Sequence, residues 1–174
     1  TFDGWLFACD VKDGKVVWKT RPHGDTDVSP VVALGRVFTA AEEESPHLYS
    51  FEEATGKEVW RLTNNLGWWS TPAVVGDRLY VGSQNNRFLC LEALTGKLVW
   101  QYPTTAPIWS SAAVVDGKVI FGGYDNHVTM LAVTDGHLIS KVNLGGRVIS
   151  SPCIVRGNVY IGTATGFFFG LTTS

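Results

Sequence analysis

The segment CLEALTGKLVW, residues 90–100, decides the fold, because it recurs along the chain in one register. Its relatives are ACDVKDGKVVW, SFEEATGKEVW and MLAVTDGHLIS, at residues 8–18, 50–60 and 130–140. The glycines of these segments are separated by 42, 40 and 40 residues: Gly14, Gly56, Gly96 and Gly136. Two other columns of the sequence repeat at the same intervals, so the chain is built from structural repeats.

Each unit predicts four short strands. In the second unit these strands cover residues 69–75, 78–83, 88–94 and 97–102, and glycine-containing turns separate them. These segments alternate apolar with polar residues and are rich in β-branched and aromatic side chains. Turn-forming residues separate them, and these features together favour strands. No segment keeps a 3.6-residue period, so we expect essentially no α-helix. Four strands in about 40 residues, repeated, predict an all-β fold, a β-propeller of four-stranded antiparallel blades.

The repeated segment resembles the tryptophan-docking motif of pyrroloquinoline-quinone (PQQ) type propeller repeats, Ala-x-Asp-x-x-Thr-Gly-x-x-x-Trp. Residues 50–60 and 90–100 keep its Thr-Gly pair and its tryptophan, with glutamate in place of the aspartate. Residues 8–18 have Asp13 in place of the threonine, and residues 130–140 have Ser140 in place of the tryptophan. The resemblance implies that three indoles dock on glycine turns of neighbouring blades and tie them together. The docking residues are Trp18, Trp60, Trp100, Gly14, Gly56 and Gly96.

The repeats organise residues 1–174 as a single propeller domain. The blade units cover about 1–20, 28–61, 69–102, 109–142 and 149–172, with 17 strands and about four repeats. The strand that stands third in each four-stranded unit occurs at both ends of the chain. A closed ring of four blades has room for only one of these two copies. We therefore expect part of a larger propeller of about seven or eight blades. A closed four-bladed ring with a displaced terminal strand is the alternative, and an open arc would favour self-association.

Composition excludes several function classes. The chain has 174 residues, a net charge of −2 and a pI near 6.0. These values argue against a basic surface that binds nucleic acid or an anionic membrane. No apolar run approaches the roughly 20 residues that span a bilayer. The chain begins at Thr1 without a signal segment, which suggests a mature product or a fragment. Three cysteines occupy apolar strand columns, so we expect buried, inert thiols: Cys9, Cys90 and Cys153.

Catalytic constellations are scarce. None of the four histidines has a partner at metal-ligand spacing, and no phosphate loop or nucleophile elbow occurs. Quinone-dependent enzymes with similar repeats also carry an adjacent Cys-Cys pair and a calcium-binding set of Glu, Asn and Asp, and this sequence lacks the Cys-Cys pair. We therefore expect no enzymatic activity, no cofactor and no metal.

One column departs from the structural pattern, immediately before the innermost strands. Asp27, Trp69, Trp109 and Ile149 are equivalent there, and Trp68 precedes Trp69. These aromatic residues either fill the mouth of the axial channel or form a platform for a flat ligand, a sugar ring or a partner side chain. The candidate ligand or partner face comprises Trp68, Trp69, Trp109, Asp27, Arg147 and His23, with Asp25, Asn64 and Asn65 at its edge.

These features favour a non-catalytic propeller scaffold that binds a protein partner or a small ligand through one face. Relatives by fold include periplasmic lipoprotein scaffolds of the outer-membrane assembly machinery, which implies a periplasmic or extracellular location. The alternatives are a fragment of a PQQ-dependent dehydrogenase and a ligand-sensing module of a larger protein.

Overall fold

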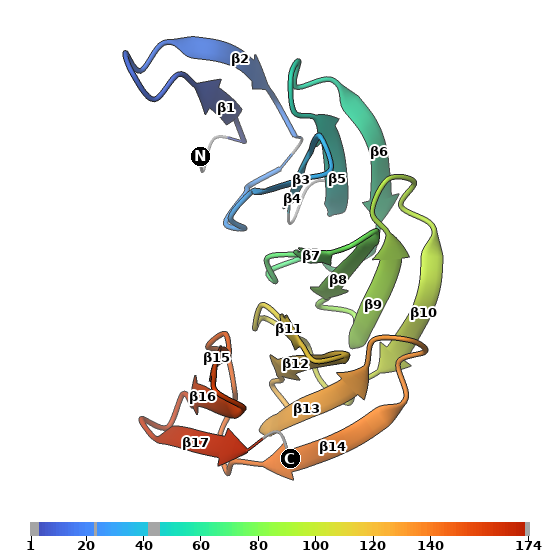
Figure 1. Ribbon diagram of the computed structural model, residues 1–174, viewed down its shortest axis with the longest axis vertical. Coiled ribbons are helices and arrows are strands. Elements are labelled where there is room, and N and C mark those ends of the chain that lie inside the picture. The colour runs from blue at the N-terminus through green and yellow to red at the C-terminus, as the bar shows by residue number, and fades with distance from the viewer. Residues whose placement is uncertain (1–3, 23, 42–45, 173–174) are drawn as a thin grey trace.

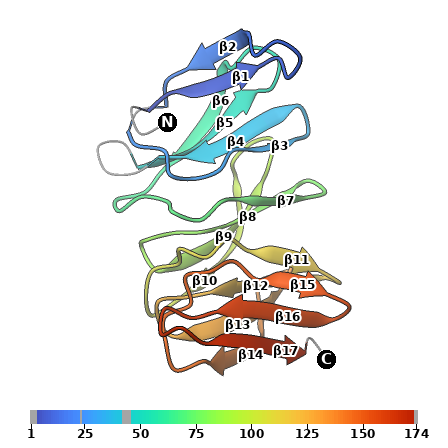
Figure 2. The same ribbon diagram turned by 90° about the vertical axis from the view of Figure 1, so that its left-hand side faces the viewer.

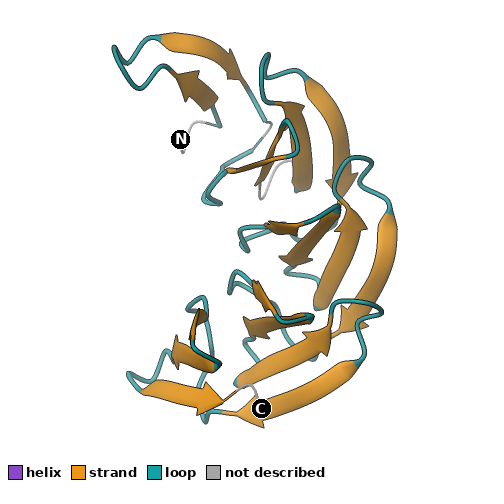
Figure 3. Ribbon diagram, in the orientation of Figure 1, coloured by secondary structure: helices purple, strands orange, loops and turns teal. Residues whose placement is uncertain are grey.

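Every regular element in the computed structural model is a β-strand. The structure describes residues 4–22, 24–41 and 46–172, and Figure 3 shows strands joined by turns throughout this part of the chain. No described segment forms a helix long and apolar enough to cross a membrane.

Seventeen strands form five antiparallel sheets, as the repeat predicted. The first sheet pairs β1 (Leu6–Cys9) with β2 (Val16–Thr20). Three four-stranded sheets follow: β3 (Val31–Ala33), β4 (Arg36–Ala40), β5 (His47–Glu52) and β6 (Glu58–Thr63); β7 (Ala73–Val75), β8 (Arg78–Gly82), β9 (Arg87–Glu92) and β10 (Leu98–Pro103); β11 (Ala113–Val115), β12 (Lys118–Gly122), β13 (His127–Ala132) and β14 (Leu138–Asn143). The last sheet has three strands, β15 (Cys153–Val155), β16 (Asn158–Gly162) and β17 (Phe168–Thr172).

The sheets stack face to face along an open arc (Figures 1 and 2). In each of the four sheets after the first, the third strand pairs with the second and, except in the last sheet, also with the fourth. The short first strands β3, β7, β11 and β15 lie on the concave side of the arc (Figure 1). Because side chains alternate along a strand, each complete sheet buries both of its faces. Leu79 and Leu91 pack toward the preceding sheet, whereas Tyr80 and Cys90 pack toward the following one.

The innermost strands are shorter than the sequence indicates, at three residues each. Residues 69–72 lead into β7 without joining its ladder. Pro72 has no N–H to donate there, and the Ser70 hydroxyl instead accepts the Gly82 N–H at 3.3 Å. Side-chain hydrogen bonds therefore do in this segment what ladder bonds do elsewhere.

The two ends of the described chain do not meet (Figure 1). β1 and β17 belong to different sheets, so the alternative of a closed four-bladed ring is wrong. The expectation of three buried thiols is also wrong, because only Cys90 is buried. Cys9 lies on the outward face of the first described sheet, and Cys153 lies in the last sheet, which no described sheet follows.

Candidate binding face

Three aromatic rings and one guanidinium form a continuous row across the sheets. The ring centroids of Trp69 and Trp109 are 3.7 Å apart, and those of Trp109 and Tyr124 are 4.4 Å apart. The Arg147 guanidinium carbon lies 5.0 Å from the Tyr124 centroid. Trp69 and Trp109 stand on the links that enter β7 and β11, Tyr124 on the β12–β13 turn and Arg147 on the β14–β15 link. We call these four residues the aromatic row.

The row is partly open to solvent. Trp69, Trp109 and Tyr124 are half-buried, and Arg147 is exposed. The Trp69 indole nitrogen is buried and has no hydrogen-bond partner in the described part of the chain. Burial raises the pKa of Tyr124, and the positive charge of Arg147 opposes this only in part. The phenol is therefore neutral at physiological pH and offers a hydroxyl donor beside a fixed positive charge.

The backbone beneath the row is held by hydrogen bonds between links. Tyr124 N–H donates to the Pro107 carbonyl at 3.0 Å, and Val148 N–H donates to the Gly123 carbonyl at 3.0 Å. Asp125 stands in the same turn as Tyr124, and its carboxylate lies 2.7 Å from Lys141 Nζ. Burial alone would raise the pKa of Asp125, but the hydrogen bond and charge of Lys141 outweigh it, so the pKa is lowered. This ion pair stiffens the turn that positions the Tyr124 ring.

The other residues of the candidate face lie elsewhere. Trp68 is 1% exposed and packs in the core between the second and third sheets, where its indole N–H donates to the Pro46 carbonyl at 3.3 Å. Asp27 is exposed, and no described contact joins it to the aromatic row. His23 lies outside the described residues. Sequence reasoning missed Tyr124, although an aromatic residue stands there while Gln84 and Ala164 occupy the equivalent positions.

Three other tryptophans join successive sheets. The indole N–H groups of Trp18, Trp60 and Trp100 donate to backbone carbonyls of the next sheet, those of Glu53, Ala93 and Val133, at 2.8, 3.0 and 3.0 Å. Each ring covers a glycine in the turn between the last two strands of that sheet, namely Gly56, Gly96 and Gly136. Gly14 differs, since nothing lies within 4 Å of where its Cβ would be. These tryptophans act in packing and leave the aromatic row as the candidate binding face.

The residues present do not fit the calcium and quinone of similar repeats in dehydrogenases. Within residues 4–22, 24–41 and 46–172, no three His, Cys, Asp or Glu side chains gather into a group that could hold a metal ion. The sequence also has no adjacent pair of cysteines. We derive no chemistry through either group.

Comparison with known proteins places this geometry in a family. The chain superposes on BamB from Moraxella catarrhalis with a TM-score of 0.87 at 16% identity, covering 99% of this chain and 56% of that one. It superposes equally well on the computationally designed Ika8 protein (TM-score 0.87, 12% identity, 98% and 53% covered). The WD40 β-propeller domain of Doa1 gives a TM-score of 0.79 at 16% identity, with 93% and 56% covered.

The chain thus spans little more than half the length of these structures, and the likeness shows that the fold is that of a β-propeller. No protein with a curated description matches the sequence. The family model described as outer membrane protein assembly factor BamB matches residues 3–65 and 44–173, nearly the whole chain. With its docking motif and stacked four-stranded sheets, the chain belongs to this family of PQQ-like propeller repeats.

Proposed function

We propose that this chain is a non-catalytic scaffold that binds an extended segment of a protein partner across the aromatic row. The observation that carries the proposal is the continuous contact from Trp69 through Trp109 and Tyr124 to Arg147. Large rigid rings and arginine supply most of the energy at protein interfaces, since they bury much area for little side-chain entropy.

The chemistry of the row specifies the partner segment. Two indole faces suit a proline or an aromatic side chain, and the Arg147 guanidinium suits a carboxylate beyond it. The family description, an outer membrane protein assembly factor, also supports protein binding and a periplasmic location.

Selection from a peptide library displayed on phage tests this function. We expect the enriched peptides to combine a proline or aromatic residue with an acidic residue. A synthetic peptide from the selection should bind the Trp69→Ala/Trp109→Ala variant at least about ten-fold more weakly than the unaltered chain. Arg147→Gln should reduce the preference for the acidic residue.

Leu98→Ala and Leu138→Ala are matched controls, because these exposed leucines lie on β10 and β14, the outer strands of the sheets that Trp69 and Trp109 precede. Peptide affinity should not change in either control. Equal affinity of the peptide for the double tryptophan variant, with its melting curve intact, would overturn the proposal.

A further inference from the structure

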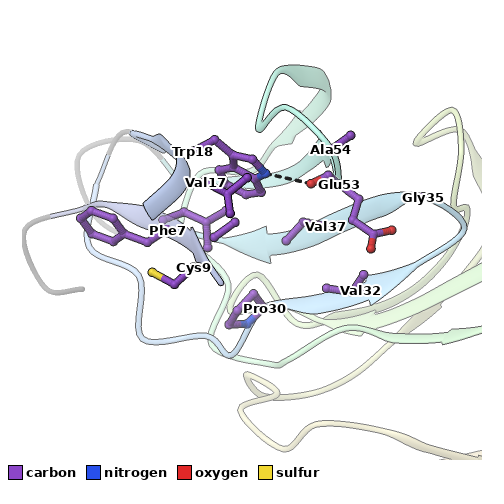
Figure 4. Close-up of a pocket in the computed structure, with 12 residues that line it drawn as sticks. Phe7, Cys9, Val17, Trp18, Pro30, Val32, Gly35, Val37, Glu53 and Ala54 are labelled. Carbon is purple, nitrogen blue, oxygen red and sulfur yellow. Dashed lines mark hydrogen bonds between the residues drawn. The ribbon is translucent and has the colours of Figure 1, made fainter. Parts of the chain in front are cut away.

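A small pocket lies between two complete sheets, the second and the third. It has a volume of about 230 Å³. A larger apolar groove of about 540 Å³ lies beside the first sheet (Figure 4). That groove borders a sheet of two strands where the complete sheets have four, so its size follows from the extent of the chain, and we assign no ligand to it. The smaller pocket has complete sheets on both sides.

Leucines of three strands and a buried indole line the smaller pocket. Leu62 comes from β6, Leu89 from β9 and Leu98 from β10, and Trp68 joins them from the β6–β7 link. Leu98 is 54% exposed, so a ligand in the pocket would cover apolar surface that now faces water. Since a cavity of about 150 Å³ holds a benzene ring, this pocket suits one six-membered ring with a short substituent.

The junction of the third and fourth sheets shows how the chain itself fills the equivalent place. Tyr102 of β10 is the equivalent of Leu62, 40 residues further along the chain. It packs against the core between the third and fourth sheets, whereas Leu62 packs against the core between the second and third with a side chain that has no ring. The same site in the repeat therefore holds a phenol ring in one junction and has room for a ring in the other.

The charges of the two junctions also differ. In the fourth sheet, the Asp125 carboxylate lies 2.7 Å from Lys141 Nζ and 3.7 Å from His127 Nδ1. The equivalent residues of the third sheet all line the pocket and include no carboxylate: Asn85, Gln101 and Arg87. The cation of the third sheet thus lacks the internal counter-ion that the fourth sheet has.

Arg87 brings hydrogen-bond donors to the pocket. Its Nη1 donates to Gln101 Oε1 at 2.8 Å, which holds the guanidinium across β9 and β10. Within the described chain, no Asp or Glu forms an ion pair with Arg87. A guanidinium has five N–H donors in a planar fork that matches a carboxylate, so donors remain for an anion. The Asn85 amide, whose oxygen accepts the Ser83 hydroxyl, adds a neutral donor.

We propose that this pocket binds a small aromatic carboxylate, a single six-membered ring with the acid on a short side chain. The ring lies between Leu62 and Leu98, in the place that Tyr102 takes in the next junction. The carboxylate accepts hydrogen bonds from Arg87 and supplies the negative charge that Asp125 supplies in the fourth sheet. The pocket shares no residue with the aromatic row, so it is a second binding site of the same chain.

Fluorine NMR with para-fluorophenylacetate tests the proposal, because the probe carries the only fluorine in the sample. Titration with the protein should give a saturable change of the probe signal. The neutral para-fluorophenylacetamide has the same ring without the charge and should bind at least about ten-fold more weakly. An acid that binds no more tightly than the amide, or that shows no saturable change at millimolar concentration, would overturn the proposal.

Leu62→Tyr is the sharpest variant, because it copies the side chain of the next junction. Tyr102 shows that the repeat accommodates this ring, so the melting curve should be preserved. The acid should bind at least about ten-fold more weakly, since two rings cannot share one close-packed space. Unchanged affinity for the acid in a folded Leu62→Tyr variant would contradict the proposed place of the ring.

Two further variants test the charge. Arg87→Gln should lower the affinity for the acid to that for the amide. Asn85→Asp gives Arg87 the carboxylate that Asp125 provides in the fourth sheet, and it should weaken binding of the acid but not of the amide. Because both side chains lie at the surface or are half-buried, these variants decide the question even if Leu62→Tyr does not fold.

Arg61→Gln is the matched control. Arg61 is an exposed arginine of β6 that pairs with Glu58 and does not line the pocket. Affinity for the acid should not change in this variant, and an equal loss in Arg61→Gln and Arg87→Gln would show attraction by net charge alone and refute the site. The peptide selected on the aromatic row should bind Leu62→Tyr as well as the unaltered chain. Loss of that peptide, without binding of the acid, would assign the pocket to the protein partner and overturn the proposal.

Discussion

At the scale of single residues, each docked indole depends on a glycine with a left-handed backbone. Gly136 has a φ of +73°, and its Cβ, if it had one, would lie 2.5 Å from Cε3 of Trp100. Gly14 has nearly the same φ, +71°, but nothing lies within 4 Å of its Cβ position. The two positions separate the cost of the backbone from the cost of displacing the indole.

Gly136→Ala should therefore destabilise the protein more than Gly14→Ala. We expect about 1 kcal/mol for the strained backbone at either position and a further 1–3 kcal/mol at Gly136, because the Trp100 ring has to move. The free energy of unfolding from urea titration measures both. Equal losses would mean that the indole adjusts without cost.

Two adjacent tryptophans show how far residue patterns reach. Trp68 and Trp69 stand in one run before β7, and both were predicted to lie on the candidate face. Trp68 is in the core and Trp69 belongs to the aromatic row, because successive residues of an extended segment point in opposite directions. The sequence places both at the channel mouth, but only the packing of two sheets determines which indole is covered.

At the scale of elements, repeated serines bind the innermost strands β7, β11 and β15 to the second strands of their sheets. The Ser110 hydroxyl accepts the Gly122 N–H at 3.1 Å, and the Ser70 hydroxyl donates to the Ser110 carbonyl at 3.0 Å. Both serines are fully buried. Their role follows from the short innermost strands, which leave backbone groups for side chains to satisfy.

Ser110→Ala should destabilise the protein by about 1–3 kcal/mol, because it leaves the buried Gly122 N–H without its acceptor. Ser140→Ala on the exposed outer strand β14 serves as the control and should change stability by less than about 0.5 kcal/mol. Chemical denaturation followed by tryptophan fluorescence measures the difference. Equal stability of the two variants would show that another group, such as water, satisfies Gly122.

At the scale of the whole molecule, the open arc divides the cysteines into two classes. Cys9 and Cys153 are exposed, each near an open end of the stack. Cys90 lies between two sheets, and burial raises the pKa of its thiol to about 11. Because the thiolate is the reactive form, Cys90 is protected by both access and protonation.

Titration with a thiol reagent at pH 8 should therefore label two cysteines quickly in the folded chain and the third only after unfolding. Cys9→Ser and Cys153→Ser should each remove one fast site, and Cys90→Ser should remove none. Fast reaction of Cys90 would show that the third and fourth sheets separate under native conditions. The number of labels per chain follows from mass spectrometry.

The strands, the sheets and the docking tryptophans can be predicted from the amino-acid sequence alone. Hairpin turns and strand alternation are local properties, and three indole–glycine pairs recur 40 or 42 residues apart, so a single chain displays them repeatedly. The packing of the sheets was needed to show that they form an open arc, that Cys9 and Cys153 are exposed and that Tyr124 completes the aromatic row. The physical reason is that burial depends on which neighbouring sheet is present, and no residue's own pattern contains that information.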